Sequence, residues 1–453
     1  MKIKRAVLLI SAVTVAAVFL GAQQGPTGTV IIRPGEIPTI AIPDMRGSGA
    51  AQSVMATFNS TLWNEVQQSG QFKMVGKSYY PTRVPQQPTD FRMPSPGFTE
   101  WTSAPVSTQW LAFGYTAPQD NQIVLRGWLY NVLQTDIASA QVIGKLYYGP
   151  MTEDGARKVA REFAADILAT FGAKTLIGTK IYFSSDRSGG KNVKEVWSMD
   201  YDGTNQKQIS RYNSTSTYPC VSPDGSKVAF MSYTGGLPKI YMYSTDTGRK
   251  LVFYNQALAT QAPSDFTPDG KEILLYGNAG QLRYFQLFRT NIDGSNLRRI
   301  TYTNSIEVEP KVNPKNPSEL VFVSGRSGPA QIYRMNIDGA DVVRLTDGTG
   351  EAVNPSWHPD GQRIAFAWTR GLEPGAHNIF VMDVATHNIT QLTHGNGRNE
   401  NPVWAPDGIH IVFSSKRGRN TQIYTMLANG NEVKQLTTQG NNEKPVWAKA
   451  ANQ

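Results

Sequence analysis

The chain has 453 residues, of which 17% are charged, and its formal net charge is +9. Lys2, Lys4 and Arg5 supply three of these positive charges, and no run of Lys or Arg occurs elsewhere, which excludes the concentrated basic surface of a nucleic-acid-binding protein. Cys220 is the only cysteine, so no disulfide can form within the chain, and we expect a small buried side chain there. The length allows two or three domains.

The first 22 residues have the pattern of a secretory signal peptide. The basic start precedes an uncharged apolar stretch, residues 6–20, and small residues follow at Gly21 and Ala22. A stretch of about 15 residues is short for a membrane span, which needs about 20. No cysteine follows it, which argues against a lipoprotein. We therefore expect an exported mature chain that begins near Gln23 and is not inserted in a membrane, and the near absence of cysteine favours a bacterial envelope protein.

Residues 23–175 predict an N-terminal α/β domain with a small mixed sheet and two helices. Val54, Phe58, Leu62 and Val66 recur every four residues, which predicts one face of a helix over residues 48–69. The domain's strands are expected over 29–32, 39–42, 109–115, 122–130 and 140–148.

The second helix of this domain is expected to begin at Thr152, whose hydroxyl can cap it. Glu153 and Asp154 stand in its first turn, where carboxylates suit the helix dipole, and Gly172 is expected to end it. Its buried face should be formed by Val159, Phe163, Ile167 and Phe171, whereas residues 81–96, rich in Pro, Gln and Arg, predict a surface loop.

Copies of one phrase fill residues 176–449 and predict a six-bladed β-propeller. The marker prolines 223, 268, 314, 359 and 406 lie 45, 46, 45 and 47 residues apart, a period typical of propeller blades with four strands. Asp-Gly pairs between short apolar runs favour tight hairpin turns. The clearest copy reads Asn354-Pro355-Ser356-Trp357-His358-Pro359-Asp360-Gly361, then Ile364-Ala365-Phe366, Ile379-Phe380-Val381-Met382 and Leu392-Thr393.

The repeat is split between the two ends of the ring. The first unit begins at Ile181-Tyr182-Phe183, the position of a second strand, and an unpaired first strand follows the last unit at residues 444–448. Pairing these two segments removes two exposed sheet edges, which otherwise invite aggregation. The sequence therefore predicts a ring closed by strand 444–448 onto the first blade.

No catalytic, cofactor or metal constellation is apparent, and we expect none. A Gly-x-Ser-x-Gly nucleophile turn, a phosphate-binding glycine loop and a His-Glu-x-x-His zinc motif do not occur. The five histidines show no ligand spacing, and we expect no carboxylates to cluster with them. A single Asp-Gly turn offers too few oxygens for Ca²⁺, although a cation in the central channel stays open.

An exported α/β domain followed by six such blades resembles the TolB family, the periplasmic propeller proteins of the Tol–Pal system in bacteria with an outer membrane. The resemblance implies a non-catalytic, monomeric periplasmic scaffold without cofactors. It would link the outer-membrane peptidoglycan-associated lipoprotein, Pal, to the inner-membrane Tol proteins for envelope integrity and outer-membrane constriction at cell division. It also implies that the propeller binds Pal and that a segment at the mature N-terminus contacts TolA.

The resemblance places the TolA contact on Gln23, Gln24, Thr27 and Thr29. Arg33 and Pro34 depart from the pattern of this family segment, where acidic or polar residues are usual.

Four arginines stand in the loops between the second and third strands of their blades. These loops share one propeller face with the connections between blades, so the arginines should surround one mouth of the channel. Together with polar residues of the inner strands, they should form a docking face for a partner. The arginines could equally anchor their own loops. The candidate docking residues are Arg187, Arg326, Arg370, Arg417, Glu309, Asn354 and Asn401.

Two other classes of function are open alternatives. An exported propeller hydrolase, or a ligand-binding propeller, would act through the central channel and would need paired carboxylates or histidines facing it. Only Asp265 and Glu309 are acidic at inner-strand positions. The propeller gate of a serine peptidase would require an adjoining hydrolase domain.

Overall fold

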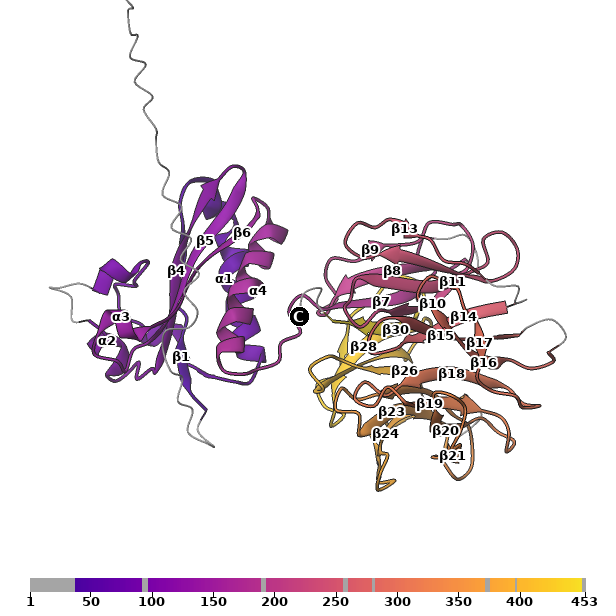
Figure 1. Ribbon diagram of the computed structural model, residues 1–453. Helices are drawn as coiled ribbons and strands as arrows, with labels where there is room; N and C mark the ends of the chain where they lie inside the picture. The colour runs from indigo at the N-terminus through magenta and orange to yellow at the C-terminus, as the bar shows by residue number, and fades with distance from the viewer. Residues whose placement is uncertain are drawn as a thin grey trace, which may run out of the picture. The chain divides into compact units, whose positions relative to one another are not determined.

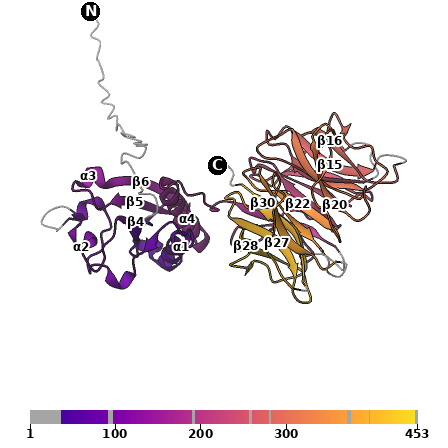
Figure 2. The same cartoon turned by 90° about the horizontal axis from the view of Figure 1, so that it is seen from below.

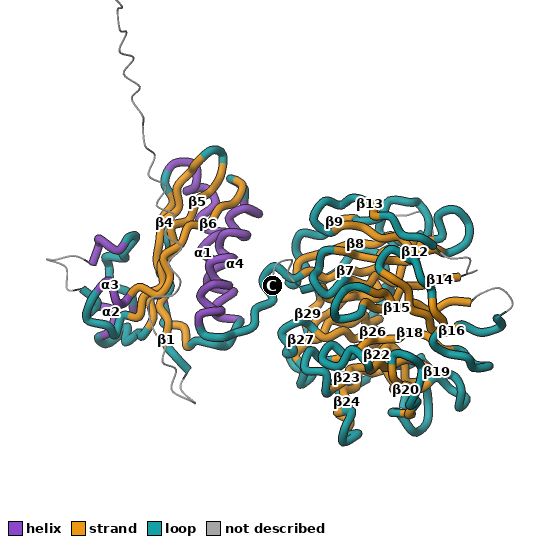
Figure 3. The backbone as a smooth tube through the Cα atoms, in the orientation of Figure 1, coloured by secondary structure: helices purple, strands orange, loops and turns teal. Residues whose placement is uncertain are grey.

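The computed structural model describes residues 37–91, 97–188, 193–255, 260–278, 282–370, 375–395 and 397–449. The chain divides into two compact units between Ala173 and Lys174. All helices of the described residues belong to the first unit, and the second consists of strands and loops (Figure 3). The predicted signal peptide and the strand expected over 29–32 lie outside the described residues. No described helix is long and apolar enough to cross a bilayer.

The N-terminal unit contains one mixed sheet in the order β3-β1-β4-β5-β6, with β2 beside β4. β1, β2 and β3 join it through parallel pairings, whereas β4, β5 and β6 form an antiparallel meander. This confirms the predicted mixed α/β domain. The strands are β1 (Thr39–Ala41), β2 (Arg46–Gly47), β3 (Lys73–Met74), β4 (Trp110–Gln119), β5 (Gln122–Asn131) and β6 (Gln141–Pro150).

Two long helices, α1 (Met55–Gln68) and α4 (Glu153–Thr170), cover one face of this sheet (Figure 1). Phe58, Leu62 and Val66 of α1 are buried as predicted, and so is Val54, which lies in the short helix just before α1. Val159, Phe163 and Ile167 of α4 are also buried. The Thr152 hydroxyl accepts from the Gly155 amide at 3.0 Å, which is the cap that the sequence predicts. Phe171 is only half-buried, and its ring packs edge-on against Trp110 with centroids 4.8 Å apart.

The other face of the sheet is covered at one end by the segment that follows β3. This segment includes short helices and carries Phe91, Phe98 and Trp101 into a core against Phe113 and Tyr130. The prediction of a surface loop over 81–96 is therefore wrong at its described end, because Phe91 is 4% exposed. The Pro and Gln content of this segment predicted exposure throughout, but the large apolar side chain of Phe91 is buried. The short elements are η1 (Gly49–Val54), η2 (Lys77–Tyr79), η3 (Pro88–Phe91), α2 (Thr99–Thr102) and α3 (Ile137–Ala140).

The second unit is a six-bladed propeller, as predicted, and each blade is a four-stranded antiparallel sheet. Every inner strand is followed in order by the second, third and fourth strands of its blade, except in the first blade. The blades are β30 (Asn442–Ala448), β7 (Lys180–Ser185), β8 (Glu195–Asp200), β9 (Lys207–Gln208); β10 (Ser216–Val221), β11 (Lys227–Ser232), β12 (Lys239–Ser244), β13 (Lys250–Leu251); β14 (Thr260–Phe266), β15 (Glu272–Asn278), β16 (Gln286–Asn291), β17 (Arg298–Arg299); β18 (Glu307–Val312), β19 (Glu319–Ser324), β20 (Gln331–Asn336), β21 (Val343–Arg344); β22 (Ala352–Trp357), β23 (Arg363–Trp368), β24 (Asn378–Asp383), β25 (Ile389–Gln391); and β26 (Arg398–Trp404), β27 (His410–Lys416), β28 (Gln422–Leu427), β29 (Lys434–Gln435).

The first blade combines both ends of the propeller sequence. β30 pairs antiparallel with β7, with Val446 opposite Tyr182 and Trp447 opposite Ile181. The two strands lie side by side although they come from distant parts of the colour scale (Figures 1 and 2). The Trp447 indole donates to the Thr179 hydroxyl at 2.9 Å, which ties the closing strand to the start of the ring.

The Asp-Gly turns carry carboxylates that bond to their own turns. The Asp224 carboxylate accepts from the Ser226 amide at 3.0 Å and from the Ser222 hydroxyl at 2.5 Å. Partial burial opposes the charge, but these hydrogen bonds and Lys227 hold the pKa of Asp224 at about 2. The pKa of Asp269 is lowered in the same way, first by the Thr267 hydroxyl.

We expect these turns to make the propeller sensitive to acid. A carboxyl whose pKa is lower in the folded state stabilises that state above its unfolded pKa of about 4, and the contribution is lost as the pH falls through the folded value. The melting temperature should therefore decline between pH 4 and pH 2, and Asp224→Asn should make the decline shallower. Circular dichroism melts from pH 2 to pH 7 measure this, and identical profiles for the two proteins would contradict it.

Candidate functional site

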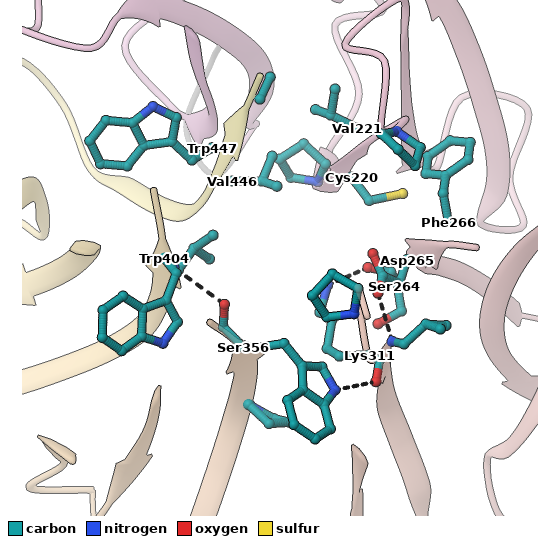
Figure 4. A pocket seen from close by; sticks show the side chains of 18 of the residues that line it. Cys220, Val221, Ser264, Asp265, Phe266, Lys311, Ser356, Trp404, Val446 and Trp447 are labelled. Carbon is teal, nitrogen blue, oxygen red and sulfur yellow. Dashed lines mark hydrogen bonds between the residues drawn. The ribbon is translucent and has the colours of Figure 1, made fainter. Parts of the chain in front are cut away.

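The six inner strands, β10, β14, β18, β22, β26 and β30, enclose a channel cavity of about 380 Å³. Tryptophans, prolines and small aliphatic side chains make up much of its wall. Asp265 and Lys311 lie among them (Figure 4). The other charged residues of the lining are Glu309, Lys315, Lys444 and Lys449. This cavity is the candidate functional site, because every blade contributes to it and it combines apolar walls with convergent polar groups.

Five of the inner strands share an unusual backbone step just before a proline. The residue in front of that proline has a left-handed φ between 52° and 56°. This conformation is uncommon outside glycine, and the register with the second strand shifts at the same point. Strain of this kind persists where the surrounding structure enforces it, and it is concentrated at functional sites. The five residues are Tyr218, Glu309, Asn354, Asn401 and Lys444.

The third blade departs from this arrangement. Pro263 and Pro268 are separated by one residue more than the corresponding prolines of the other blades, for example Pro219 and Pro223. Its bulge lies between Pro263 and Asp265. Asp265, which follows this bulge, is among the residues that line the channel.

Three of the predicted docking residues form a hydrogen-bonded chain along the channel. The Glu309 carboxylate accepts from the Asn354 amide N–H at 2.8 Å and from its side-chain Nδ2 at 2.9 Å. The Asn354 Oδ1 then accepts from the Asn401 backbone N–H at 3.2 Å. The structure therefore brings Glu309, Asn354 and Asn401 of three successive blades together, in the channel lining.

Lys444 and Tyr218 complete this level of the channel. The Lys444 ammonium lies 4.1 Å from the centre of the Tyr218 ring. Burial works against the charge, but Tyr218 and the carboxylates of Glu309 and Glu443 raise the pKa of Lys444 above its ordinary value. The site therefore holds a cation at neutral pH, beside the acceptors of the asparagine chain.

A second polar cluster lies between the second, third and fourth blades. The Lys311 ammonium donates to the Ser264 carbonyl, and the Asp265 carboxylate accepts from the Val312 amide at 2.8 Å (Figure 4). Burial raises the pKa of Asp265, and Lys311 opposes this. Burial also raises the pKa of the nearby Cys220 thiol, so this cysteine is a neutral, buried side chain at pH 7.

None of the four predicted arginines is among the residues that line the channel cavity. Each guanidinium instead lies over aromatic rings of its own blade. Arg187 stacks on Phe183 and Trp197, Arg326 on Phe322 and Tyr333, Arg370 on Trp368 and Phe380, and Arg417 on Tyr424, at 4.5 to 6.0 Å from the ring centres.

Arg187 and Arg326 are further fixed by polar contacts. Arg187 donates to the Asn442 Oδ1 at 2.7 Å, and Arg326 forms an ion pair of 3.1 Å with the buried Glu307. The interpretation of the arginines as anchors of their own loops, which the sequence left open, accounts for these contacts. Arg370 and Arg417 remain exposed to solvent.

Histidines and carboxylates meet in pairs, contrary to the sequence expectation that carboxylates do not cluster with them. His358 lies 2.8 Å from Asp360, His377 lies 3.0 Å from Glu400, and His410 lies 2.6 Å from Asp407. Within the described residues, no group of three or more His, Cys, Asp or Glu side chains is arranged to hold a metal ion.

Sequence reasoning missed Tyr218, Lys444 and Lys311. The sequence could have identified two of them. When the repeat copies are aligned on the proline of each inner strand, Tyr218 and Lys444 occupy the position that Glu309, Asn354 and Asn401 occupy in other copies. Gln23, Gln24, Thr27 and Thr29 lie outside the described residues.

Known proteins share this architecture and part of this sequence. Residues 168–370 and 345–453, together more than half of the chain, match the family model described as the TolB beta propeller domain. A "Protein TolB homolog" of Chlorobium chlorochromatii is 31% identical over 226 residues, covering 48% of this chain and 46% of the relative. That of Chlorobium luteolum is 31% identical over 191 residues, covering 42% and 41%.

The aligned part of the chain thus spans less than half the length of these curated relatives. Among solved structures, TolB from Acinetobacter baumannii superimposes with a TM-score of 0.69 at 21% identity, covering 92% of this chain and 97% of that one. This likeness extends the shared fold to both units. With the match of its propeller to the family model, the chain belongs to the TolB family of β-propeller proteins.

Proposed function

We propose that the protein is a non-catalytic periplasmic scaffold of the Tol–Pal system. Its propeller binds the peptidoglycan-associated lipoprotein Pal, and its mature N-terminal segment, residues 23–34, binds TolA. In this role it links the outer membrane to the inner-membrane Tol proteins, for envelope integrity and constriction at cell division. Membership of the TolB family supports the proposal.

The observation that carries the proposal is the ring of strained residues before proline in the channel. Five blades hold Tyr218, Glu309, Asn354, Asn401 and Lys444 at one level, in a backbone conformation that costs free energy. Such a preorganised set of donors, acceptors and one cation suits the docking of a protein segment with mixed polarity.

The acidic groups of the channel are already engaged by the protein itself. Glu309 accepts from Asn354, and Asp265 accepts from Val312 while lying close to Lys311. In this arrangement the carboxylates order the wall and are held away from the roles of a free general acid and base. This supports docking over hydrolysis through the channel.

The docking surface we propose is centred on the channel residues, whereas the surface expected from the sequence was centred on the four arginines. Glu309, Asn354 and Asn401 remain in it, and Lys444 and Tyr218 join them. Arg370 and Arg417 contribute at the exposed loops of the fifth and sixth blades, whereas Arg187 and Arg326 serve chiefly to hold their loops.

A pull-down from solubilised envelope tests both contacts, with the mature full-length protein and a variant lacking residues 23–34 as baits. We expect the full-length bait to recover Pal and TolA, and the shortened bait to recover Pal with at least tenfold less TolA. Failure of both baits to recover Pal, or turnover of a sugar or peptide substrate by the pure protein, would overturn the scaffold proposal. Equal recovery of TolA by the two baits would overturn the assignment of the TolA contact alone.

A further inference from the structure

The outer edge of β6 in the N-terminal sheet ends the strand order without a described neighbour. β6 pairs with β5 on one side, from Pro150 opposite Gln122 to Ile143 opposite Leu129. A ten-residue edge strand presents a row of backbone N–H and C=O groups that can template another strand. Natural proteins usually protect such edges with charged or short strands.

The side chains beside this edge differ between the two faces of the sheet. On the face covered by the helices, the Asp166 carboxylate accepts from Lys145 Nζ and from the Tyr147 hydroxyl, both at 2.8 Å. On the opposite face, Leu146 and Tyr148 are 40% and 43% exposed, and neither side chain is charged; the one charged group at Tyr148 among the described contacts is the Lys158 ammonium, which donates to its backbone carbonyl at 3.3 Å. The side chains of β6 on the helix-covered face are therefore engaged in polar contacts, whereas those on the opposite face are apolar and exposed.

The open face continues onto β4 and β5. Leu146 lies directly opposite Arg126 in the register, and Arg126 lies opposite Tyr115. Trp128, two residues further along β5, stacks on Phe113 with centroids 5.6 Å apart. The short helices α2 and α3 lie only at the far end of this face (Figure 1).

Arg126 gives this surface a positive charge. Its side chain is exposed, and no carboxylate of the described residues forms an ion pair with it. The side chains directly across from it are Tyr115 and Leu146, which contribute no negative charge. A guanidinium among apolar and aromatic groups is suited to a carboxylate of an incoming chain.

We propose that the β6 edge accepts an extended segment of a partner protein, which adds a strand to the N-terminal sheet. The segment alternates apolar side chains, which pack on Leu146 and Tyr148, and it carries an acidic residue that pairs with Arg126. Backbone hydrogen bonds supply affinity in this mode of recognition, and the alternate side chains supply specificity. This site is separate from the propeller channel and does not depend on the function proposed above.

Three nine-residue peptides test the proposal against the full-length protein. The first alternates valine and threonine around a central glutamate, the second has lysine in place of that glutamate, and the third is the first with alternate backbone amides N-methylated. Fluorescence anisotropy gives their affinities, and hydrogen exchange locates their contacts. We expect the acidic peptide to bind and to protect the amides of β6, the lysine peptide to bind at least tenfold more weakly, and the methylated peptide not to bind.

Two variants separate the components of the site. Arg126→Ala should reduce the difference between the acidic and lysine peptides to less than threefold, and Leu146→Lys should weaken both. Lys434→Ala, on the exposed outer strand β29 of the propeller, serves as a control with unchanged binding, and melting curves verify that all variants are folded. Equal binding of the methylated peptide, or no protection of β6 by the acidic peptide, would overturn the proposal. So would a dimer in sedimentation that Leu146→Lys dissociates, because a second copy would then occupy the edge.

Discussion

Deleting residues 440–453 is expected to abolish the folded propeller, because the first blade then loses its inner strand. The Trp447 side chain is 7% exposed, and loss of such a buried aromatic group alone costs about 3–5 kcal/mol. The Asp186 carboxylate also loses the Asn441 backbone and side-chain amides, which donate to it at 2.6 and 2.7 Å. These losses are comparable with the whole stability of a domain, about 5–15 kcal/mol.

The deletion also exposes the edge of β7, which pairs with β30 in the full chain, so the variant should associate through this edge. Size-exclusion chromatography and circular dichroism measure both effects. Deleting only residues 450–453, which follow the closing strand, is the matched control and should behave as the full chain. A deletion variant that stays monomeric and melts within about 5 °C of the full chain would show that β30 is dispensable.

Arg326→Ala is expected to destabilise the protein by about 3 kcal/mol, because it leaves a buried carboxylate without its cation. The Glu307 side chain is fully buried, and the Thr303, Ser305 and Ser324 hydroxyls donate to it at 2.7, 2.8 and 3.0 Å. Arg326 supplies the one positive charge paired with it in the described residues, at 3.1 Å. The hydroxyls alone cannot replace that charge.

Arg370→Ala is the matched comparison. Arg370 lies 4.9 Å from the Trp368 ring centre but pairs with no described carboxylate, so its loss should cost about 1 kcal/mol. Urea unfolding of both variants, and of the double variant Glu307→Gln with Arg326→Ala, measures the difference. The double variant should recover part of the stability lost in Arg326→Ala. Equal destabilisation by the two single substitutions would contradict the role of the buried pair.

This comparison also affects how interface experiments are interpreted. Arg326 contributes to the fold, so reduced partner binding by an Arg326 variant reports on docking only if the variant is shown to be folded. Arg370 and Arg417 are exposed and can be substituted with less risk to the propeller.

The propeller was largely predictable because its constraints are repeated in the sequence. Each copy predicts the same hairpins through its Asp-Gly turns. The unpaired strand around Trp447 can be assigned to the first blade because an exposed sheet edge there would invite aggregation. The N-terminal domain was predictable where the apolar residues recur over a long stretch, as in the helices α1 and α4. The segment around Phe91 was not, because its burial depends on a distant sheet face and leaves no periodic pattern.

The site was predictable in part. Glu309, Asn354 and Asn401 stand in the proline-marked phrase, and the structure places them together. The stacking of the arginines was not predictable, because loop membership fixes the face of a propeller but not the neighbours that a side chain contacts. Their aromatic partners, such as Tyr333 and Tyr424, lie on third strands, and the sequence of a loop does not reveal such contacts.

The most direct test of the scaffold is isothermal titration of the mature full-length protein with the soluble domain of Pal. We predict saturable binding at one Pal per chain, weakened at least tenfold by Lys444→Glu in the channel. Lys434→Glu on the exposed outer strand β29 is the control and should leave the affinity unchanged. Absence of binding by the folded protein, or an affinity that Lys444→Glu does not alter, would contradict docking at the channel.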